Sequence, residues 1–319
     1  MKRLKKFLIT IVILFFGLYI WGMIYSIQPA LITRQIAADT SRIKNDLYYL
    51  TKECRFRNFQ HTDQLNKAAD YIKKQFETVA EDVSFQTYMI DTVQYKNVIC
   101  SIGPKDAERI IIGAHYDACL DKEGADDNAS GVCGVLELAR LLSKEKLKYR
   151  IDLVAYANEE PPFFGTNNMG SYIHAKSLFD NKVKVKGMIS LEMIGTYSDE
   201  PGSQHYPVFF LKWFYGDKGN FITVTKKFFA GDFARFISRR MKKEQVILTK
   251  SFTGPRWAGI DLSDHRNYWA FDYSAVMITN TAFYRNEYYH TSNDVAERLN
   301  INKMSLVIDE VYRTLLDVK

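Results

Sequence analysis

Short apolar runs alternate with helical patterns along most of this chain, and this alternation leaves few folds open. Strand character is expected at residues 83–87, 97–102, 109–114, 151–157, 185–191 and 275–279. Helical spacing of apolar residues is expected at residues 45–54, 66–78, 129–142, 170–178, 228–240 and 303–316. Buried strands separated by helices are typical of a parallel sheet covered on both faces. The pattern therefore predicts an α/β fold around a largely parallel sheet.

Residues 196–220 fit neither pattern, and they are rich in glycine and aromatic residues. Long irregular segments in compact domains often serve as lids over a functional site. We therefore treat this segment as a candidate lid, although the sequence does not predict where it lies.

The start of the chain predicts a membrane anchor. A basic segment, residues 1–6, precedes an uncharged, mostly apolar run at residues 7–25, about the length that crosses a bilayer as a helix. The run has no polar face and no clear cleavage site follows it, which favours an uncleaved transmembrane helix over a signal peptide or a buried helix. The positive-inside rule keeps the basic end in the cytoplasm. Residues 26–39 then form a stalk, and residues 40–319 form one domain outside the inner or plasma membrane.

The overall charge argues against nucleic acid as a partner. The formal charge is +6, from 43 basic and 37 acidic residues. Four of the basic residues precede the apolar run, which leaves 39 against 37 in the rest of the chain. A nucleic-acid surface needs a stronger basic excess than this.

Four cysteines would meet an oxidising compartment if this topology holds, so one or two disulfides could form. Their spacing does not indicate a pairing, and none belongs to a C-x-x-C motif. We expect small buried side chains rather than metal ligands. The cysteines are Cys54, Cys100, Cys119 and Cys133.

Residues of metal-ligand type follow the predicted strands where the strands end. In an open α/β sheet, ligands bind outside the carboxyl ends of the strands, so these positions converge in the fold. Each residue alone could be structural, and the segment GADDNASG could simply cap a helix. Four strand ends that all lead to such residues favour a site instead. The candidate ligands are His115, Asp127, Glu160, Glu192 and His290.

The ligand types indicate the metal and the chemistry. Imidazole and carboxylate ligands without thiolates suit zinc, or another divalent transition metal, in an open catalytic site. Two histidines and three carboxylates are enough for two ions that share one bridging ligand. Such a site also needs a carboxylate to take a proton from water, and Glu159 fits that role. Asp117, two residues beyond His115, is placed to hold the other nitrogen of that imidazole.

Six stretches resemble the di-zinc aminopeptidase family, which also contains glutaminyl cyclases and glutamate carboxypeptidase. They occur in the family's order over about residues 66–316. The stretches are GAHYD, GADDNASGV, YANEEPPFFGTNNMGS, SLEMIG, SDHRNYW and AFYRNEYYHTSNDVAERLN.

The resemblance implies a three-layer α/β/α domain and a role for each site residue. Asp127 would bridge two zinc ions, with His115 and Glu192 on one ion and Glu160 and His290 on the other. Glu159 would be the general base, and Asp117 would orient His115. The resemblance also implies a cis peptide after Asp127. Many family members carry aspartate where this chain has Glu192, so that ligand departs from the pattern.

The expected function is a zinc-dependent aminopeptidase that hydrolyses the N-terminal peptide bond, with Glu159 taking a proton from a water between the metals. Its partners would be peptides or small amides, and the membrane through residues 7–25. The alternatives are a glutaminyl cyclase, which typically uses one metal, a metal-dependent amidohydrolase, and an inactive scaffold. A scaffold should have lost ligands or the base, and this chain has lost none. The G-x-S-x-G, H-E-x-x-H and P-loop motifs are absent from the sequence.

Three further pairs of residues have open roles. They could contact substrate or support the site, or they could be surface ion pairs and a loop cap. The pairs are Arg57 with Asn58, Asp264 with His265, and Arg285 with Asn286.

Overall fold

The computed structural model describes residues 3, 5–13, 16–17, 31, 35–244 and 246–318. The predicted anchor at residues 7–25 and the predicted stalk at residues 26–39 lie partly outside these residues. Within the described part of the chain, no helix combines the length and the apolar character needed to cross a membrane.

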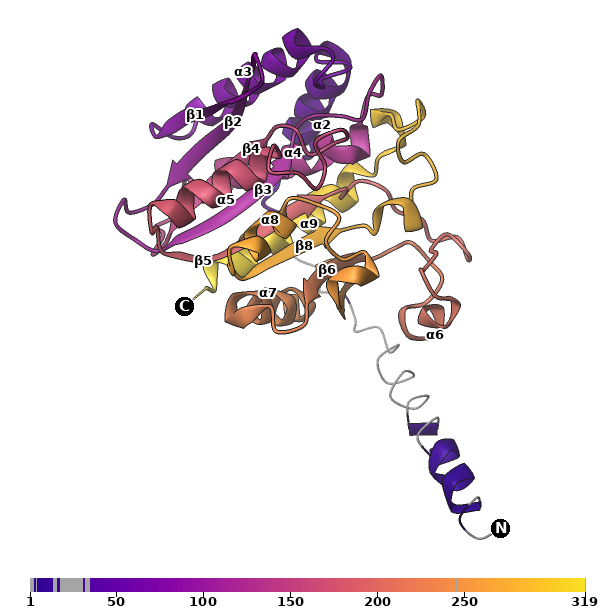
Figure 1. The fold of residues 1–319 in the computed structure, drawn as a ribbon. Coiled ribbons are helices and arrows are strands. Elements are labelled where there is room, and N and C mark those ends of the chain that lie inside the picture. Colours follow the sequence, from indigo (N-terminus) through magenta and orange to yellow (C-terminus); the bar gives the residue numbers. More distant parts are fainter. Residues whose placement is uncertain are drawn as a thin grey trace.

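A mixed sheet of eight strands lies at the centre of the described chain (Figure 1). The strands are β1 (Val83–Ile90), β2 (Val93–Ile102), β3 (Arg109–His115), β4 (Arg150–Tyr156), β5 (Val185–Glu192), β6 (Ile222–Lys227), β7 (Thr249–Gly254) and β8 (Ala275–Thr279). Their order across the sheet is β1-β2-β4-β3-β5-β8-β6-β7. The central strands β4, β3, β5 and β8 are parallel, as is the β6–β7 pair. The pairs β1–β2, β2–β4 and β6–β8 are antiparallel, so the sheet is mixed and largely parallel, as predicted.

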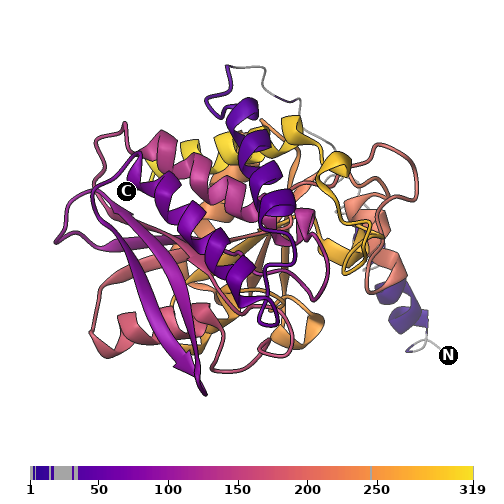
Figure 2. The same ribbon diagram turned by 90° about the horizontal axis from the view of Figure 1, so that it is seen from above.

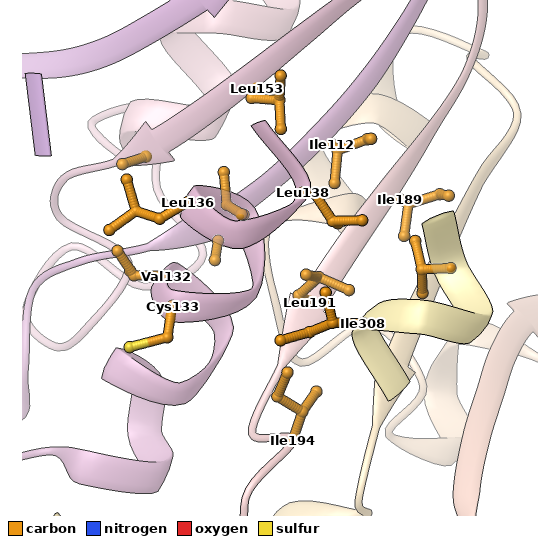
Figure 3. Close-up of a cluster of buried hydrophobic side chains, with 14 of the residues drawn as sticks. Ile112, Val132, Cys133, Leu136, Leu138, Leu153, Ile189, Leu191, Ile194 and Ile308 are labelled. Atoms are coloured by element: carbon orange, nitrogen blue, oxygen red, sulfur yellow. The ribbon is translucent and has the colours of Figure 1, made fainter. Parts of the chain in front are cut away.

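Helices cover both faces of the sheet and give three layers (Figure 2). One face carries α2 (Thr40–Tyr48), α3 (Thr62–Glu77), α4 (Gly131–Leu142), α7 (Gly231–Glu244) and α9 (Ile301–Leu316), and the other carries α5 (Gly170–Asp180) and α8 (His265–Ala270). Successive side chains of a strand point to opposite faces. Accordingly, Ile110 and Ile112 of β3 belong to the first apolar cluster and Ile111 belongs to the second. Figure 3 shows part of the first cluster, where Leu138 of α4 lies near Ile112.

The unpredicted elements all lie in the second half of the chain. β6 and β7 were missed because polar residues dominate them, and β7 is an edge strand that is only partly buried. The short helix α8 was missed as well. The helix expected at residues 228–240 begins later, at Gly231, because Phe229 has a positive φ of 57° and belongs to the preceding turn.

The candidate lid at residues 196–220 is largely irregular. It contains one 3₁₀ turn (Phe209–Leu211) and the single-turn helix α6 (Lys212–Tyr215). Its two ends run side by side, because the backbone N–H of Ser198 donates to Gly219 and that of Gln204 donates to Asp217. The segment is therefore a closed loop that leaves the sheet and returns to β6.

All four cysteines are free, so the disulfides that an oxidising compartment would permit are not formed. Cys54, Cys100 and Cys133 are buried, as expected of small core side chains. Cys119 differs, because it is partly exposed.

Candidate metal centre

The ends of β3, β4 and β5 meet at one edge of the sheet. β3 lies between β4 and β5 and is parallel to both. His115 is the last residue of β3 and Glu192 is the last residue of β5. Glu159 and Glu160 follow β4 by a short turn in which Asn158 has a positive φ of 63°. The topology thus brings three of the predicted strand-end positions together, as the sequence analysis expected.

One half of the cluster surrounds His115. Its Nε2 atom lies 3.3 Å from Oδ1 of Asp127 and 3.5 Å from Oε2 of Glu192. The ligand atoms of these three residues all lie within 4.8 Å of one another, and all three residues are buried. Ser263 donates a hydrogen bond of 2.7 Å to Oε2 of Glu192, which holds that carboxylate toward the imidazole. The carboxylate of Glu192 therefore lies with the imidazole of His115 and the carboxylate of Asp127 around one candidate metal position, although its side chain is longer than that of aspartate.

The other half surrounds His290, which arrives from the long loop after β8. Its Nε2 atom lies 3.1 Å from Oδ2 of Asp127 and 3.2 Å from Oε2 of Glu160. Asp127 therefore faces one imidazole with each carboxylate oxygen. The peptide between Asp127 and Asn128 is cis, as the resemblance implied.

The donor set fits a divalent cation. Oε1 of Glu160 and Nε2 of His290 are buried atoms without hydrogen-bond partners. Burial raises the pKa of Glu160 to about 8. Burial also disfavours the charged form of Asp127, but the neighbouring imidazoles of His115 and His290 outweigh it, so the pKa of that carboxyl lies below its usual value. Carboxylates outnumber imidazoles here, and a bound zinc ion would compensate the excess negative charge.

Asp117 joins the ends of β3 and β4. Its two carboxylate oxygens accept the backbone N–H groups of Glu159 at 3.1 Å and Glu160 at 3.0 Å. Oδ1 also lies 3.4 Å from Nδ1 of His115. The sequence predicted only the contact with His115. The structure adds that Asp117 positions the backbone of the candidate base and of one candidate ligand.

Glu159 lies beside the cluster but belongs to neither ligand group. Its Oε2 atom is 3.9 Å from Nε2 of His115, and burial raises the pKa of its carboxyl well above the usual value. This position suits the role predicted for it, a carboxylate that handles protons and does not bind metal.

Asp294 and Asp126 organise the backbone around Asp127, and the sequence analysis missed both. Asp294 accepts the N–H groups of Asp126 at 3.0 Å and Asp127 at 3.1 Å. Asp126 in turn accepts the backbone N–H of Gly195 at 2.8 Å and the side-chain amide of Asn286 at 3.0 Å. Polar residues that fix metal ligands are common around such sites. The only available signal was their place in the motifs GADDNASG and HTSND.

Arg57 and Arg285 are neither substrate contacts nor surface ion pairs. Both are buried, and neither lines the cavity beside the cluster. Arg285 donates to Oε1 of Gln204 at 2.9 Å and to the carbonyl of Phe221 at 2.7 Å, so it ties the lid to β6. Arg57 holds the loop after β3 through the carbonyl oxygens of Tyr116, Glu123 and Gly124, and it joins this loop to the carbonyl oxygen of Leu50.

Asp264 and His265 lie at the start of α8, and both are buried. A ring nitrogen of His265 lies 2.7 Å from the carbonyl oxygen of Ile260, a residue that lines the cavity. His265 therefore has the supporting role that the sequence left open.

A cavity of about 200 Å³ adjoins the cluster. One side is acidic and contains Asp127, Glu159, Glu160, Glu192 and His290. The remaining wall is mainly apolar and comes from the lid, β6, β7, the segment before α8, and β8. Members of this wall include Tyr215, Phe221, Phe252, Ile260, Leu262 and Met277. The lid prediction is consistent with this arrangement, because lid residues Gln204 to Pro207 line the cavity.

A mixed sheet between helical layers, with imidazoles and carboxylates at the ends of its central strands, is typical of a metal-dependent enzyme of the α/β/α class. The chain belongs to Peptidase family M28, whose family model matches residues 97–315. The resemblance seen in the sequence motifs is thereby confirmed, and the chain is a zinc metallopeptidase at the level of its family.

Individual relatives agree with the family. The Escherichia coli (strain K12) protein named Uncharacterized protein YfbL is 42% identical over 328 residues, covering 99% of this chain and 100% of that protein. The Legionella pneumophila LapA aminopeptidase structure has a TM-score of 0.70 at 21% identity, over 88% of this chain and 71% of that chain. The Bacteroides thetaiotaomicron glutaminyl cyclase structure has a TM-score of 0.67 at 17% identity, over 89% of this chain and 100% of that chain. Both structures share the fold of this chain. The fold alone therefore does not decide between an aminopeptidase, which hydrolyses, and a glutaminyl cyclase, which cyclises.

Proposed function

We propose that this chain is a two-zinc aminopeptidase that removes the N-terminal residue of peptides. The observation that carries the proposal is the position of Asp127. One of its oxygens lies 3.3 Å from the imidazole of His115, and the other lies 3.1 Å from that of His290. A single carboxylate between two imidazole–carboxylate pairs is the arrangement that two neighbouring ions need.

The ligands would divide into two sets around Asp127. His115 and Glu192 would hold one ion, and Glu160 and His290 would hold the other. When bound, the two zinc ions would polarise the scissile carbonyl and lower the pKa of the attacking water.

Glu159 would then carry the proton. Its carboxylate lines the cavity beside the His115 ligand set, where it could accept a proton from the attacking water and pass it to the leaving amine. Asp117 holds the backbone N–H of Glu159 and so positions this base. The apolar wall of the cavity suits an aliphatic or aromatic N-terminal side chain.

Glutaminyl cyclisation is the second candidate, because a solved glutaminyl cyclase is covered over its full length by the match. Metal analysis combined with two substrate sets separates the candidates. The purified chain should contain two zinc ions and should release the N-terminal residue from aminoacyl chromogenic substrates and short peptides. Cyclisation of N-terminal glutaminyl peptides without hydrolysis, or a single bound ion with no peptidase activity, would contradict the proposal.

We also propose that residues 7–25 anchor the chain and that residues 26–39 are a stalk that presents residues 40–319 outside the inner or plasma membrane. The support is the apolar run and the basic residues before it. Membrane fractionation of the full chain and of a form lacking residues 1–25 tests this. Recovery of the full chain in the soluble fraction would contradict it.

A further inference from the structure

Cys119 is the one cysteine near the metal centre. It lies on the loop after β3, two residues beyond Asp117. Its Sγ atom and the ligand atoms of Glu160 and His290 all lie within 4.8 Å of one another. The other three cysteines are buried in the apolar core.

Polar atoms without partners indicate a cation at the same point. Oε1 of Glu160 has no hydrogen-bond partner, although only 5% of the residue is exposed. Nε2 of His290 also lacks one, although carboxylate oxygens lie 3.1 Å and 3.2 Å away. Buried polar atoms are rarely left unpaired, and a bound ion is one of the explanations.

We propose that Cys119 is a thiolate ligand of the ion held by Asp127, Glu160 and His290. The inference rests on the metal centre of the proposed function and adds a fourth protein donor to one half of it. Donors at ~2.0–2.3 Å from one zinc ion in a tetrahedron are ~3.3–3.8 Å apart. The oxygen–nitrogen distances of 3.1 Å and 3.2 Å around His290 are close to that spacing, and the sulfur lies within 4.8 Å of the ligand atoms of Glu160 and His290.

The loop around Cys119 is held in place from both sides. Arg57 donates from Nε to the carbonyl of Tyr116 at 2.7 Å. The backbone N–H of Ala118 donates to the carbonyl of Arg57 at 2.9 Å. The side chain of Asn58 donates to the carbonyl of Leu120. Arg57 and Asn58 therefore fix the backbone on each side of Cys119. This restricts the positions that the Cys119 sulfur can take and keeps it near the site.

The two halves of the metal centre would then differ in their number of protein ligands. Zinc with four protein ligands is typical of closed sites, whereas three ligands leave a position for water or substrate. The His290 half has Cys119, Asp127, Glu160 and His290 as donors. The His115 half has three donors, His115, Asp127 and Glu192, and Glu159 lies beside it. The ion in the His290 half should therefore bind more tightly than the ion in the His115 half.

Binding involves no redox change. The S–H bond of Cys119 breaks, its proton goes to solvent, and the sulfur lone pair forms the bond to the divalent ion. Zinc binding should therefore release one proton more in the wild type than in Cys119→Ser.

Cobalt substitution gives the direct test. The apoprotein is loaded with two equivalents of Co²⁺, and the near-ultraviolet absorption is recorded for the wild type, Cys119→Ser and the control Cys100→Ala. A sulfur-to-cobalt charge-transfer band should appear in the wild type and the control and should be absent in Cys119→Ser. In the zinc-loaded wild type, X-ray absorption should show sulfur scattering at ~2.3 Å.

Two further measurements keep the proposal testable even if a variant folds poorly. In the wild type, bound zinc should slow alkylation of Cys119 at least tenfold, as mapped by mass spectrometry. Competition with a chelator should show a tighter and a weaker ion, and Cys119→Ser should weaken the tighter one at least tenfold. A protein with two ions and peptidase activity but no sulfur signal overturns the role of Cys119 and leaves the proposed function intact. A protein that binds no metal overturns both.

Discussion

The acidic side of the cavity and its apolar wall differ in how they are built. The acidic side comes mainly from the ends of adjacent parallel strands, and neighbouring polar atoms on it lie 3.0–3.9 Å apart. The wall comes from a later part of the chain and combines the irregular lid, β6, β7, the segment before α8, and β8. We expect the acidic side to set turnover and metal binding, and the wall to set which peptides are accepted.

The strongest test of this division is the candidate base. Glu159→Ala should lower kcat by about 10²–10⁴-fold, the range for loss of a positioned proton carrier, while the protein keeps its zinc. Steady-state kinetics and metal analysis check this. The matched control is Glu81→Ala, an exposed glutamate before β1, which should leave both unchanged. Unaltered turnover in Glu159→Ala would remove the assigned base.

A support residue should affect metal binding more than it affects substrate choice. Ser263→Ala removes the 2.7 Å hydrogen bond to Glu192, and zinc affinity of the His115 half should fall about 10–100-fold. Chelator competition measures the change, and Ser84→Ala on the exposed side of β1 serves as the control. If the affinity is unchanged, Glu192 is oriented by something other than Ser263.

A wall residue should change selectivity without changing metal content. Leu262 lines the cavity and is 38% exposed, so its truncation should be tolerated by the fold. Leu262→Ala should lower kcat/KM for large apolar N-terminal residues by about tenfold relative to alanine, because apolar contacts are lost. Leu316→Ala at the end of α9 is the control. An equal loss of kcat/KM for all substrates would show that the wall does not determine substrate choice separately from the acidic side.

The smallest expected effect concerns hydrogen bonds between β4, which leads to the acidic side, and α8, which follows one segment of the wall. Nδ1 of His174 lies 2.6 Å from the hydroxyl of Tyr268 in α8, which in turn lies 2.7 Å from the hydroxyl of Tyr156 in β4. Burial lowers the pKa of His174 to about 4 from 6.5. The unfolded chain therefore binds more protons between these values, and this contribution to stability is present above pH 6.5 and lost as the pH falls toward 4.

Replacing His174 should consequently destabilise the protein more at pH 7 than at pH 5. The difference should be at most ~1.4 kcal/mol per pH unit. Urea unfolding of the wild type and His174→Gln at both values measures it, with the exposed His205→Gln as the control. A difference that does not depend on pH would show that His174 does not stay neutral in the folded protein.

The acidic side was largely predictable because it follows from topology. Parallel strands end at one edge, so His115, Glu160 and Glu192 had to converge once the strands were recognised. Asp127 and His290 were expected at the same edge because they follow predicted strands, and the motif resemblance supplied their roles and the cis peptide. The supporting residues were not predictable in the same way. Arg57 reaches four carbonyl oxygens and Asp294 two backbone N–H groups, and neither set of partners leaves a pattern in the sequence.

By itself, the sequence determined the α/β alternation, the central strands and the positions of the candidate ligands, because apolar periodicity and strand ends are local properties. Tertiary structure alone decided the antiparallel edges, the cavity wall and the place of Cys119. Residues 119, 160 and 290 are far apart in the chain, and only the packing of three loops around one point brings their ligand atoms within 4.8 Å. A set of ligands that includes a sulfur therefore emerged where the sequence indicated only imidazoles and carboxylates.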